Sequence, residues 1–136
     1  MNGEIGTVVV VGSGHAAVEA ALASRRLGLE TTIVALNVAK VSSMPCNPSI
    51  GGPGKAQIVS EIDALGGEMA LATDHATTSM RLLNASKGPA VQSLRAQVDK
   101  KVYAAHMRRA LGEAGVRMVQ GMVRNILVGK DGRACG

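Results

Sequence analysis

The chain has 136 residues, about the length of one small domain. Apolar residues make up 46% of it and aromatic residues only 1%, so its core must consist of aliphatic side chains and methionine. No apolar run approaches the roughly 18 residues that a membrane span needs, and the first residues lack the features of a secretion signal. We therefore expect a cytoplasmic protein without a membrane partner.

Residues 1–36 contain the pattern of a βαβ unit. The run TVVVV at 7–11 predicts a strand buried on both faces at the centre of a sheet. A glycine-containing turn, an alanine-rich helix that Gly28 can end, and a second strand at 31–36 follow. Strand, turn, helix and strand within about thirty residues indicate a parallel sheet.

The rest of the chain predicts further helices and strands. Residues 56–65 predict a short helix closed by Gly66 and Gly67, and residues 79–83 a strand. From 90 to 114, apolar residues at steps of three and four predict one long amphipathic helix: Val91, Leu94, Val98, Val102 and Ala105. Two final strands are expected at 116–119 and 123–128. The pattern as a whole predicts an α/β fold.

Charge is unevenly distributed along the chain. Residues 1–80 carry four basic and seven acidic side chains, whereas residues 81–136 carry eleven and three. A basic half is consistent with an anionic partner such as nucleic acid or a phosphate-bearing cofactor, and a solvated helix surface is the alternative. The two cysteines lie 89 positions apart without a CxxC motif, which predicts neither a disulfide nor a metal site.

The glycine turn has the spacing of a dinucleotide-binding motif. Gly12 can make the tight turn out of the strand, Gly14 allows close backbone approach to a pyrophosphate, and Ala17 permits close helix packing. The phosphates would then lie at a helix N-terminus. A plain strand-to-helix turn is the alternative. The acid that usually binds the ribose is replaced by Asn37, whose amide could bind a ribose hydroxyl instead.

The loop SSMPCNPSIGGPGKAQ, residues 42–57, holds Cys46 between Pro45 and Pro48 and continues into three glycines and Lys55. It is not a Walker phosphate loop, because the first glycine and the metal-binding hydroxyl of that motif are absent. Prolines that stiffen the backbone can hold a thiol in front of a flat ligand, where a thiolate could act as a nucleophile. The alternative is a buried cysteine that only packs.

Four segments resemble the MnmG (GidA) family of tRNA wobble-uridine modification enzymes. They are VVVVGSGHAAVEAALA, SMPCNPSIGGPGK, EIDALGGEMA and LLNASKGPAVQSLRAQVDK, in the order in which they occur in that family. The resemblance runs from about residue 6 to residue 128. It implies that residues 1–136 are the N-terminal part of a Rossmann-like FAD-binding domain, which is incomplete in this chain.

The resemblance also implies a function. Members of the family are homodimeric flavoproteins that use FAD, NADH and methylene-tetrahydrofolate. With an MnmE-type GTPase they add a (carboxymethyl)aminomethyl group to carbon 5 of uridine 34 in tRNA. The chain alone is expected to be catalytically incomplete. Alternatives are another FAD-dependent protein, such as a folate-dependent tRNA uridine methyltransferase, and a non-catalytic nucleotide-binding fragment.

Individual site residues follow from the resemblance. Cys46 matches the family's loop cysteine near the isoalloxazine and is the candidate nucleophile. Val123 matches a position whose backbone approaches the adenine. The FAD pyrophosphate loop corresponds to Gly12, Ser13, Gly14, His15, Ala16 and Ala17. Basic residues in the family's motif segments are candidates for contacts with ligand or RNA: Lys55, Arg81, Lys87 and Arg95. For Arg95 the favoured alternative is a salt bridge and solvation at a helix surface, and His75 and His106 are expected at the surface.

Overall fold

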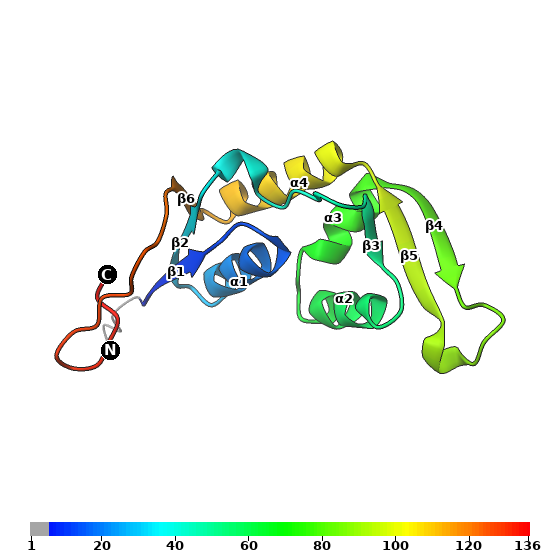
Figure 1. The fold of residues 1–136 in the computed structure, drawn as a ribbon, viewed down its shortest axis with the longest axis horizontal. Helices are drawn as coiled ribbons and strands as arrows, with labels where there is room; N and C mark the ends of the chain where they lie inside the picture. Colours follow the sequence, from blue (N-terminus) through cyan, green and yellow to red (C-terminus); the bar gives the residue numbers. More distant parts are fainter. Residues whose placement is uncertain (1–5) are drawn as a thin grey trace.

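The computed structural model describes residues 6–136; residues 1–5, which the expected domain includes, lie outside the described residues. Two small units lie side by side, each with its own three-stranded sheet (Figure 1). One sheet is parallel and the other antiparallel. The predicted α/β fold with a parallel sheet is confirmed, whereas a separate antiparallel sheet was not predicted.

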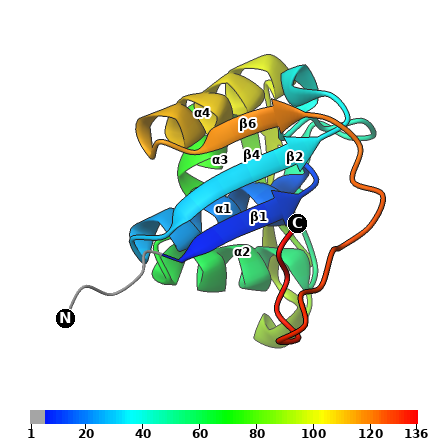
Figure 2. The same ribbon diagram turned by 90° about the vertical axis from the view of Figure 1, so that its left-hand side faces the viewer.

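The parallel sheet contains β1 (Thr7–Val11), β2 (Glu30–Ala35) and β6 (Arg117–Gln120) in the order β1-β2-β6. Helix α1 (His15–Arg26) connects β1 to β2, as the βαβ pattern predicted, and Gly28 follows it with a φ of +81°. Helix α4 (Lys100–Glu113) leads into β6. Both helices lie behind the sheet in Figure 2, on the same face.

The expectation that residues 7–11 form a central, fully buried strand is wrong. Strand β1 pairs only with β2 within the described residues, so it is an edge strand and β2 is central. The third strand of this sheet, β6, pairs with β2 and not with β1, which leaves β1 at the edge. Val9 and Val11 are 58% and 62% exposed, because no helix of the described residues covers their face of the sheet.

The antiparallel sheet has the order β3-β5-β4, with β3 (Ser49–Gly51), β4 (Thr77–Leu83) and β5 (Ser93–Val98). Helices α2 (Lys55–Ala64) and α3 (Met69–Ala76) pack beside it. Two short 3₁₀ helices complete the chain, η1 (Val38–Lys40) and η2 (Pro89–Val91). The strand expected at 79–83 and the helix expected at 56–65 are therefore confirmed.

The long helix expected from 90 to 114 is wrong in its first half. Residues 93–98 form β5, whose hydrogen bonds are taken by β3 and β4 on its two sides. Helix α4 begins after Asp99, whose side chain accepts hydrogen bonds from the backbone N–H groups of Lys101 (2.7 Å) and Val102 (3.1 Å). The buried face of α4 consists of Tyr103, Ala104, Met107 and Leu111 rather than the predicted stripe.

The strand expected at 123–128 is also wrong, whereas that at 116–119 is confirmed as β6. Residues 122–127 follow no regular structure, and Val128 makes a single isolated bridge with Ala134. Their β-branched residues lie in the irregular C-terminal segment, and Ile126 and Val128 are 71% and 63% exposed.

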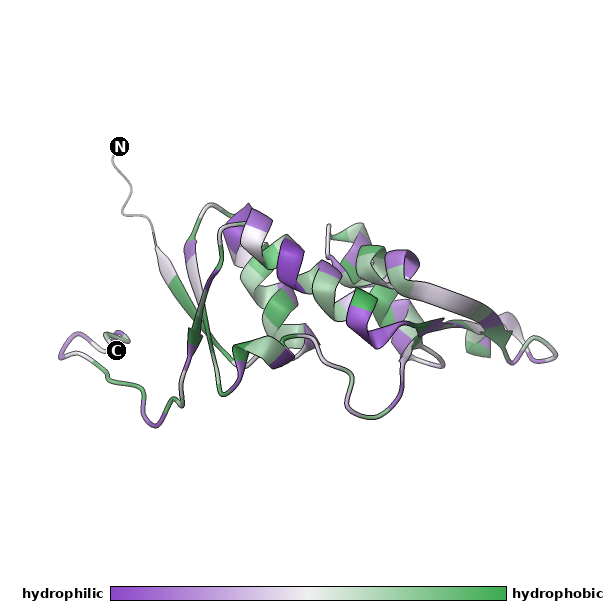
Figure 3. Ribbon diagram, turned by 90° about the horizontal axis from the view of Figure 1, so that it is seen from above, coloured by the Kyte–Doolittle hydropathy of each residue, from purple (hydrophilic) through white to green (hydrophobic). Residues whose placement is uncertain are grey.

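The core is mostly aliphatic and runs from the space between the parallel sheet and its two helices into the antiparallel unit, where Ala72 and Ala76 of α3 and Ala96 and Val98 of β5 belong to it. Its fully buried side chains include Val18 from α1, Ile33 from β2, and Tyr103, Met107 and Leu111 from α4. In Figure 3 the strands of the parallel sheet carry both hydrophobic and hydrophilic residues, and of the three strands only β2 is mostly buried. Within residues 6–136, no helix has the length and apolarity to span a membrane.

A carboxylate connects the two units. Glu19 on α1 accepts hydrogen bonds from the backbone N–H groups of Glu68 (2.9 Å) and Met69 (2.6 Å) at the N-terminus of α3. Its negative charge also interacts favourably with the dipole of that helix. Gly67 allows this approach, because a Cβ there would overlap Ile62 and lie 3.0 Å from the Glu19 carboxylate. The connection fixes α1 relative to the antiparallel unit and thereby shapes the cleft between them.

Candidate functional site

The turn between β1 and α1 leaves a helix N-terminus uncovered. Gly12 has a φ of +119°, a conformation that glycine adopts far more readily than other residues, and its N–H donates to the Val34 carbonyl at 2.8 Å. Gly14 is the N-cap of α1 and provides no capping side chain. A Cβ added to Gly14 would meet nothing within 4 Å. The first N–H groups of α1 are therefore accessible to an anion.

Neighbouring residues hold this turn in place. A Cβ at Gly12 would lie 3.9 Å from the Cβ of Ala17, so a small residue at each position brings strand and helix together. The Ser13 carbonyl accepts a hydrogen bond from the N–H of the buried Ser42 at 2.9 Å. Asn37, the expected ribose ligand, instead accepts a hydrogen bond from Ala39 N at 2.9 Å and caps η1.

His15 begins α1 and lies against Tyr103, the only Phe, Tyr or Trp residue of the chain. Its Nδ1 is 3.5 Å from the hydroxyl of Tyr103, and the two rings meet edge to face with centroids 5.5 Å apart. Burial lowers the pKa of His15 below its ordinary value, which favours a neutral imidazole. Burial, with a further contribution from the Glu19 charge, raises the pKa of Tyr103, so its hydroxyl stays protonated. A neutral His15 can orient a ligand by hydrogen bonding beside the helix N-terminus.

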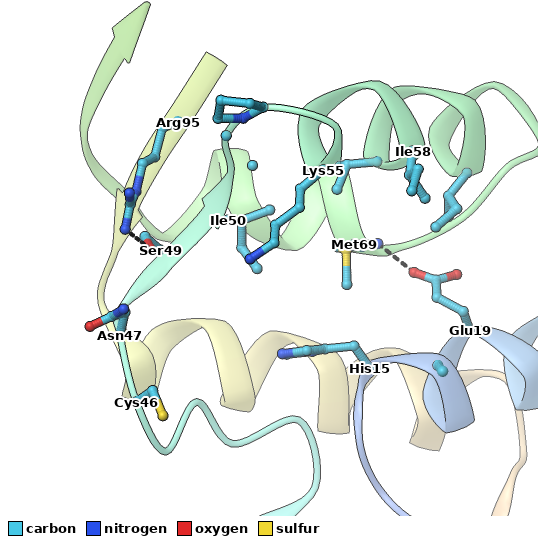
Figure 4. A pocket seen from close by; sticks show the side chains of 16 residues that line it. His15, Glu19, Cys46, Asn47, Ser49, Ile50, Lys55, Ile58, Met69 and Arg95 are labelled. Atoms are coloured by element: carbon cyan, nitrogen blue, oxygen red, sulfur yellow. Dashed lines mark hydrogen bonds between the residues drawn. The ribbon is translucent and has the colours of Figure 1, made fainter. Parts of the chain in front are cut away.

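A cavity of about 610 Å³ opens between the N-terminal part of α1, the 46–53 loop and α2. Figure 4 shows His15 and Lys55 pointing into it from opposite sides, with Cys46 at one end and Glu19 at the other. Ligand pockets for small molecules typically have volumes of about 300–1,000 Å³. Its other lining residues include Ala16, Asn47, Ser49, Ile50, Gly51, Gly52, Ile58, Met69 and Arg95.

Cys46 is an exposed free thiol that lines this cavity. The interpretation of Cys46 as a buried packing residue is therefore wrong. Lys100, at the start of α4, donates a hydrogen bond from Nζ to the Cys46 carbonyl at 3.3 Å. This bond ties the loop to α4 and places a positive charge beside the cysteine.

The glycines after Cys46 allow the loop to pass close to β5. Gly51 has a φ of +90°, and a Cβ there would overlap the Leu94 carbonyl oxygen. The N–H of Gly52 donates to that same oxygen at 2.7 Å. Lys55 follows at the beginning of α2, where its backbone N–H donates to the Gly52 carbonyl at 3.0 Å. The glycines thus bring the backbone of one cavity wall against the sheet.

The basic candidates occupy three different environments. Lys55 and Arg95 line the large cavity, whereas Arg81 does not, and Lys87 lies exposed in the turn between β4 and η2. Arg95 donates from Nη2 to the Ser49 hydroxyl at 3.1 Å (Figure 4). The salt bridge and helix-surface position favoured for Arg95 are wrong, because Arg95 lies on strand β5 and the ion pairs within residues 6–136 do not include it.

Val123 lies apart from the cavity. It is 39% exposed and lines a separate cavity of about 480 Å³ against β1, together with Val9, Val11 and Ile126. The structure therefore brings together the glycine turn, His15, Ala16 and Cys46, but not Val123. Across the part of the chain that the structure describes, no group of three or more His, Cys, Asp or Glu residues is placed to hold a metal ion.

Sequence reasoning missed three residues that shape the site: Glu19, Lys100 and Tyr103. A single carboxylate in an alanine-rich helix and a single aromatic residue in the chain were the available signals. The expectation that His106 lies at the surface is wrong, because its Nε2 is 2.6 Å from a Glu68 carboxylate oxygen and its side chain is 12% exposed. His75 is exposed, as expected.

The family model described as "Glucose inhibited division protein A" matches residues 7–136. The Bacillus licheniformis protein named "tRNA uridine 5-carboxymethylaminomethyl modification enzyme MnmG" is 55% identical over 130 residues, which are 95% of this chain and 20% of that protein. The chain thus spans about a fifth of the length of the curated relatives it matches.

Solved structures give the same result. The Aquifex aeolicus GidA structure in its form II crystal superposes with a TM-score of 0.86 at 44% identity, covering 94% of this chain and 21% of the other. The flavin-dependent halogenase Xcc4156 of Xanthomonas campestris superposes at 0.57 with 15% identity, covering 96% of this chain and 38% of the other, which indicates a shared fold. The chain belongs to the glucose inhibited division protein A family.

Proposed function

We propose that this chain binds FAD with the pyrophosphate at the N-terminus of α1, and that it contributes this site to an enzyme that modifies carbon 5 of the wobble uridine, uridine 34, in tRNA. One observation carries the proposal: the uncapped start of α1 and the thiol of Cys46 border the same cavity. The names of the relatives, which specify a tRNA uridine modification enzyme, support the reaction.

The residues at the turn fit a pyrophosphate. The space beside Gly14 would be filled by any side chain, and the accessible N–H groups of α1 are hydrogen-bond donors for phosphate oxygens. Ser13 in the turn and His15, Ala16 and Ala17 in the first turn of α1 supply further backbone groups, and all of them except His15 have small side chains. We further propose that the backbone at Val123 approaches the adenine, since it lines a cavity along the same strand that leads into the turn.

When bound, the flavin would supply redox chemistry, and the chain's own residues would position the reactants. Cys46 would present its sulfur, as the nucleophile, to an electrophilic carbon in the cavity. The Lys100 contact to the Cys46 carbonyl holds the loop, and Pro45 and Pro48 restrict its backbone. Lys55 extends into the same space and would attract anionic groups.

The remaining features of the proposal concern the whole enzyme. We propose that it takes electrons from NADH and a one-carbon unit from methylene-tetrahydrofolate, and that it works in the cytoplasm as a homodimer with an MnmE-type GTPase. They rest on the family to which the chain belongs.

A chimaera tests the proposed function. Residues 7–136 would replace the matching segment of the Bacillus licheniformis relative, and the product would be expressed in a strain that lacks its own copy of the enzyme. We expect the chimaera to retain FAD on purification and to restore the modified wobble uridine, measured by mass spectrometry of tRNA nucleosides. A stable chimaera that binds FAD but leaves the uridine unmodified would favour the alternative, a nucleotide-binding segment without a catalytic role.

A further inference from the structure

Two arginines lie directly opposite each other in the antiparallel sheet. Arg81 on β4 and Arg95 on β5 are register partners. Side chains at paired positions of neighbouring strands project from the same face, with their Cβ atoms about 5 Å apart. Like charges in this arrangement destabilise a sheet, so the pair calls for a compensating anion.

No carboxylate supplies this compensation within the described residues. The ion pairs of residues 6–136 are His106–Glu68 and Arg109–Glu113, and neither involves Arg81 or Arg95. Arg95 uses Nη2 for the neutral Ser49 hydroxyl, while its Nε is buried without any hydrogen-bond partner. A buried charged donor without an acceptor is unfavourable, and buried donors are normally paired. Among residues 6–136 the Arg95 Nε–H therefore remains available to an acceptor from outside this part of the chain, and an anionic ligand would satisfy it.

The space beside the two arginines can hold such an acceptor. A cavity of about 380 Å³ is lined by Arg81, Arg95, Ser79, Gln97 and Leu83. Its polar side chains other than the arginines are neutral, and it contains no acid. Arg95 also lines the large cavity that holds Cys46, so it borders both spaces. A ligand that extends from the large cavity across the sheet would reach the arginine pair.

We propose that Arg81 and Arg95 form a phosphate-binding site that holds one phosphodiester group of the RNA strand whose base enters the cavity beside Cys46. Guanidinium groups match the oxygens of phosphate, and two of them can engage different oxygens of one group. The assignment to RNA rests on the proposed function. Because phosphate contacts fix register and carry no sequence information, this site would position the nucleotide rather than select it.

The anion site can be tested without RNA. In the 136-residue chain, the side-chain Nε–H signal of Arg95 would be followed by NMR during titration with inorganic phosphate. We expect a saturable shift in the wild-type chain and a weaker or absent shift in Arg81→Gln. Arg26→Gln removes the same charge from the exposed last turn of α1 and should leave the titration unchanged. An Arg95 signal that does not respond, or that responds equally in Arg81→Gln, would overturn the site.

The source of the phosphate is tested in the chimaera with tRNA. Each lost phosphate contact lowers the slope of log affinity against log salt by about 1. We expect Arg81→Gln to weaken binding of tRNA and to lower this slope by about 1, whereas Arg26→Gln leaves the slope unchanged. If the wild-type chimaera does not bind tRNA, the proposed function fails. If it binds and modifies tRNA but the slope is unaltered by Arg81→Gln, this inference alone fails.

Discussion

Because the N-terminus of α1 is uncovered, we predict that a substitution of Gly14 weakens ligand binding without destabilising the fold. Gly14 has an ordinary φ of −74°, and a Cβ at this position would meet nothing within 4 Å. Alanine is a poorer N-cap than glycine, which lowers the free energy of unfolding by about 1 kcal/mol. It also restricts the unfolded chain, which raises the free energy of unfolding by about 0.4–1 kcal/mol. The net change in the free energy of unfolding should therefore be within about 1 kcal/mol, or roughly 4 °C in Tm.

Flavin binding should respond much more strongly. The added methyl group fills the space through which a pyrophosphate would reach the backbone donors, and each charge-assisted hydrogen bond contributes about 1.5–3 kcal/mol. Loss of one such bond raises the Kd for FAD by roughly 10- to 150-fold. Titration of the chimaera with FAD, followed by quenching of flavin fluorescence, measures this change.

Gly28→Ala is the matched control for Gly14→Ala. Gly28 also has open space around it, but its φ of +81° strains any other residue by about 1–2 kcal/mol. It lies at the far end of α1, so the control should lower Tm and leave FAD affinity intact. Unchanged FAD affinity in Gly14→Ala, or a larger loss of Tm there than in Gly28→Ala, would refute the reasoning.

Three further substitutions test other parts of the structure. Glu19→Ala leaves two N–H groups of α3 without an acceptor and should lower the free energy of unfolding in urea by about 2–4 kcal/mol, whereas the exposed Glu61→Ala should change it by less than about 0.5 kcal/mol. Gly51→Ala combines a positive φ with a backbone overlap and should lower the free energy of unfolding by about 3 kcal/mol or more, whereas Gly88→Ala should leave it nearly unchanged. Similar Tm values for the two variants would contradict the assigned loop geometry. Because burial lowers the pKa of His15 below 6.5, its contribution to stability is fully present above pH 6.5 and is lost as pH falls through its folded pKa. The fall in Tm between pH 7.5 and 5.5 should therefore be smaller in His15→Gln than in the wild type, and an equal fall would show that another group is responsible.

Local sequence signals predicted the βαβ unit and the phosphate turn because both depend on nearby residues. The apolar runs, the glycine spacing and the Gly28 stop each act within a few positions of the chain. Cys46 was likewise recognisable from its prolines and glycines, although its exposure was not. Helices, strands and turns that depend on residues close together in the chain could therefore be predicted from the sequence.

The antiparallel sheet could not be predicted in this way, because it depends on distant pairing. Residues 93–98 alternate polar and apolar residues, which suits a strand, but Leu94 and Val98 also continue the helical spacing of the residues that follow. The hydrogen bonds to β3 and β4 decide between the two in favour of a strand. The cleft has the same origin: Glu19 reaches α3 from 49 positions away in the chain, and Lys100 reaches Cys46 from 54. Such contacts leave no periodic signal in a single sequence.

The central claim is that Cys46 acts chemically in a flavin-dependent modification of tRNA, and one comparison tests it most directly. Cys46→Ser and Cys135→Ser would each be introduced into the chimaera, since both thiols are free and exposed. Serine fills nearly the same volume but does not supply a thiolate. We predict that both variants keep the wild-type Tm and FAD content, while Cys46→Ser alone lowers the modified wobble uridine in tRNA by about 100-fold or more, since loss of a catalytic nucleophile lowers kcat by at least this much. Modification by Cys46→Ser at the level of Cys135→Ser would contradict the claim.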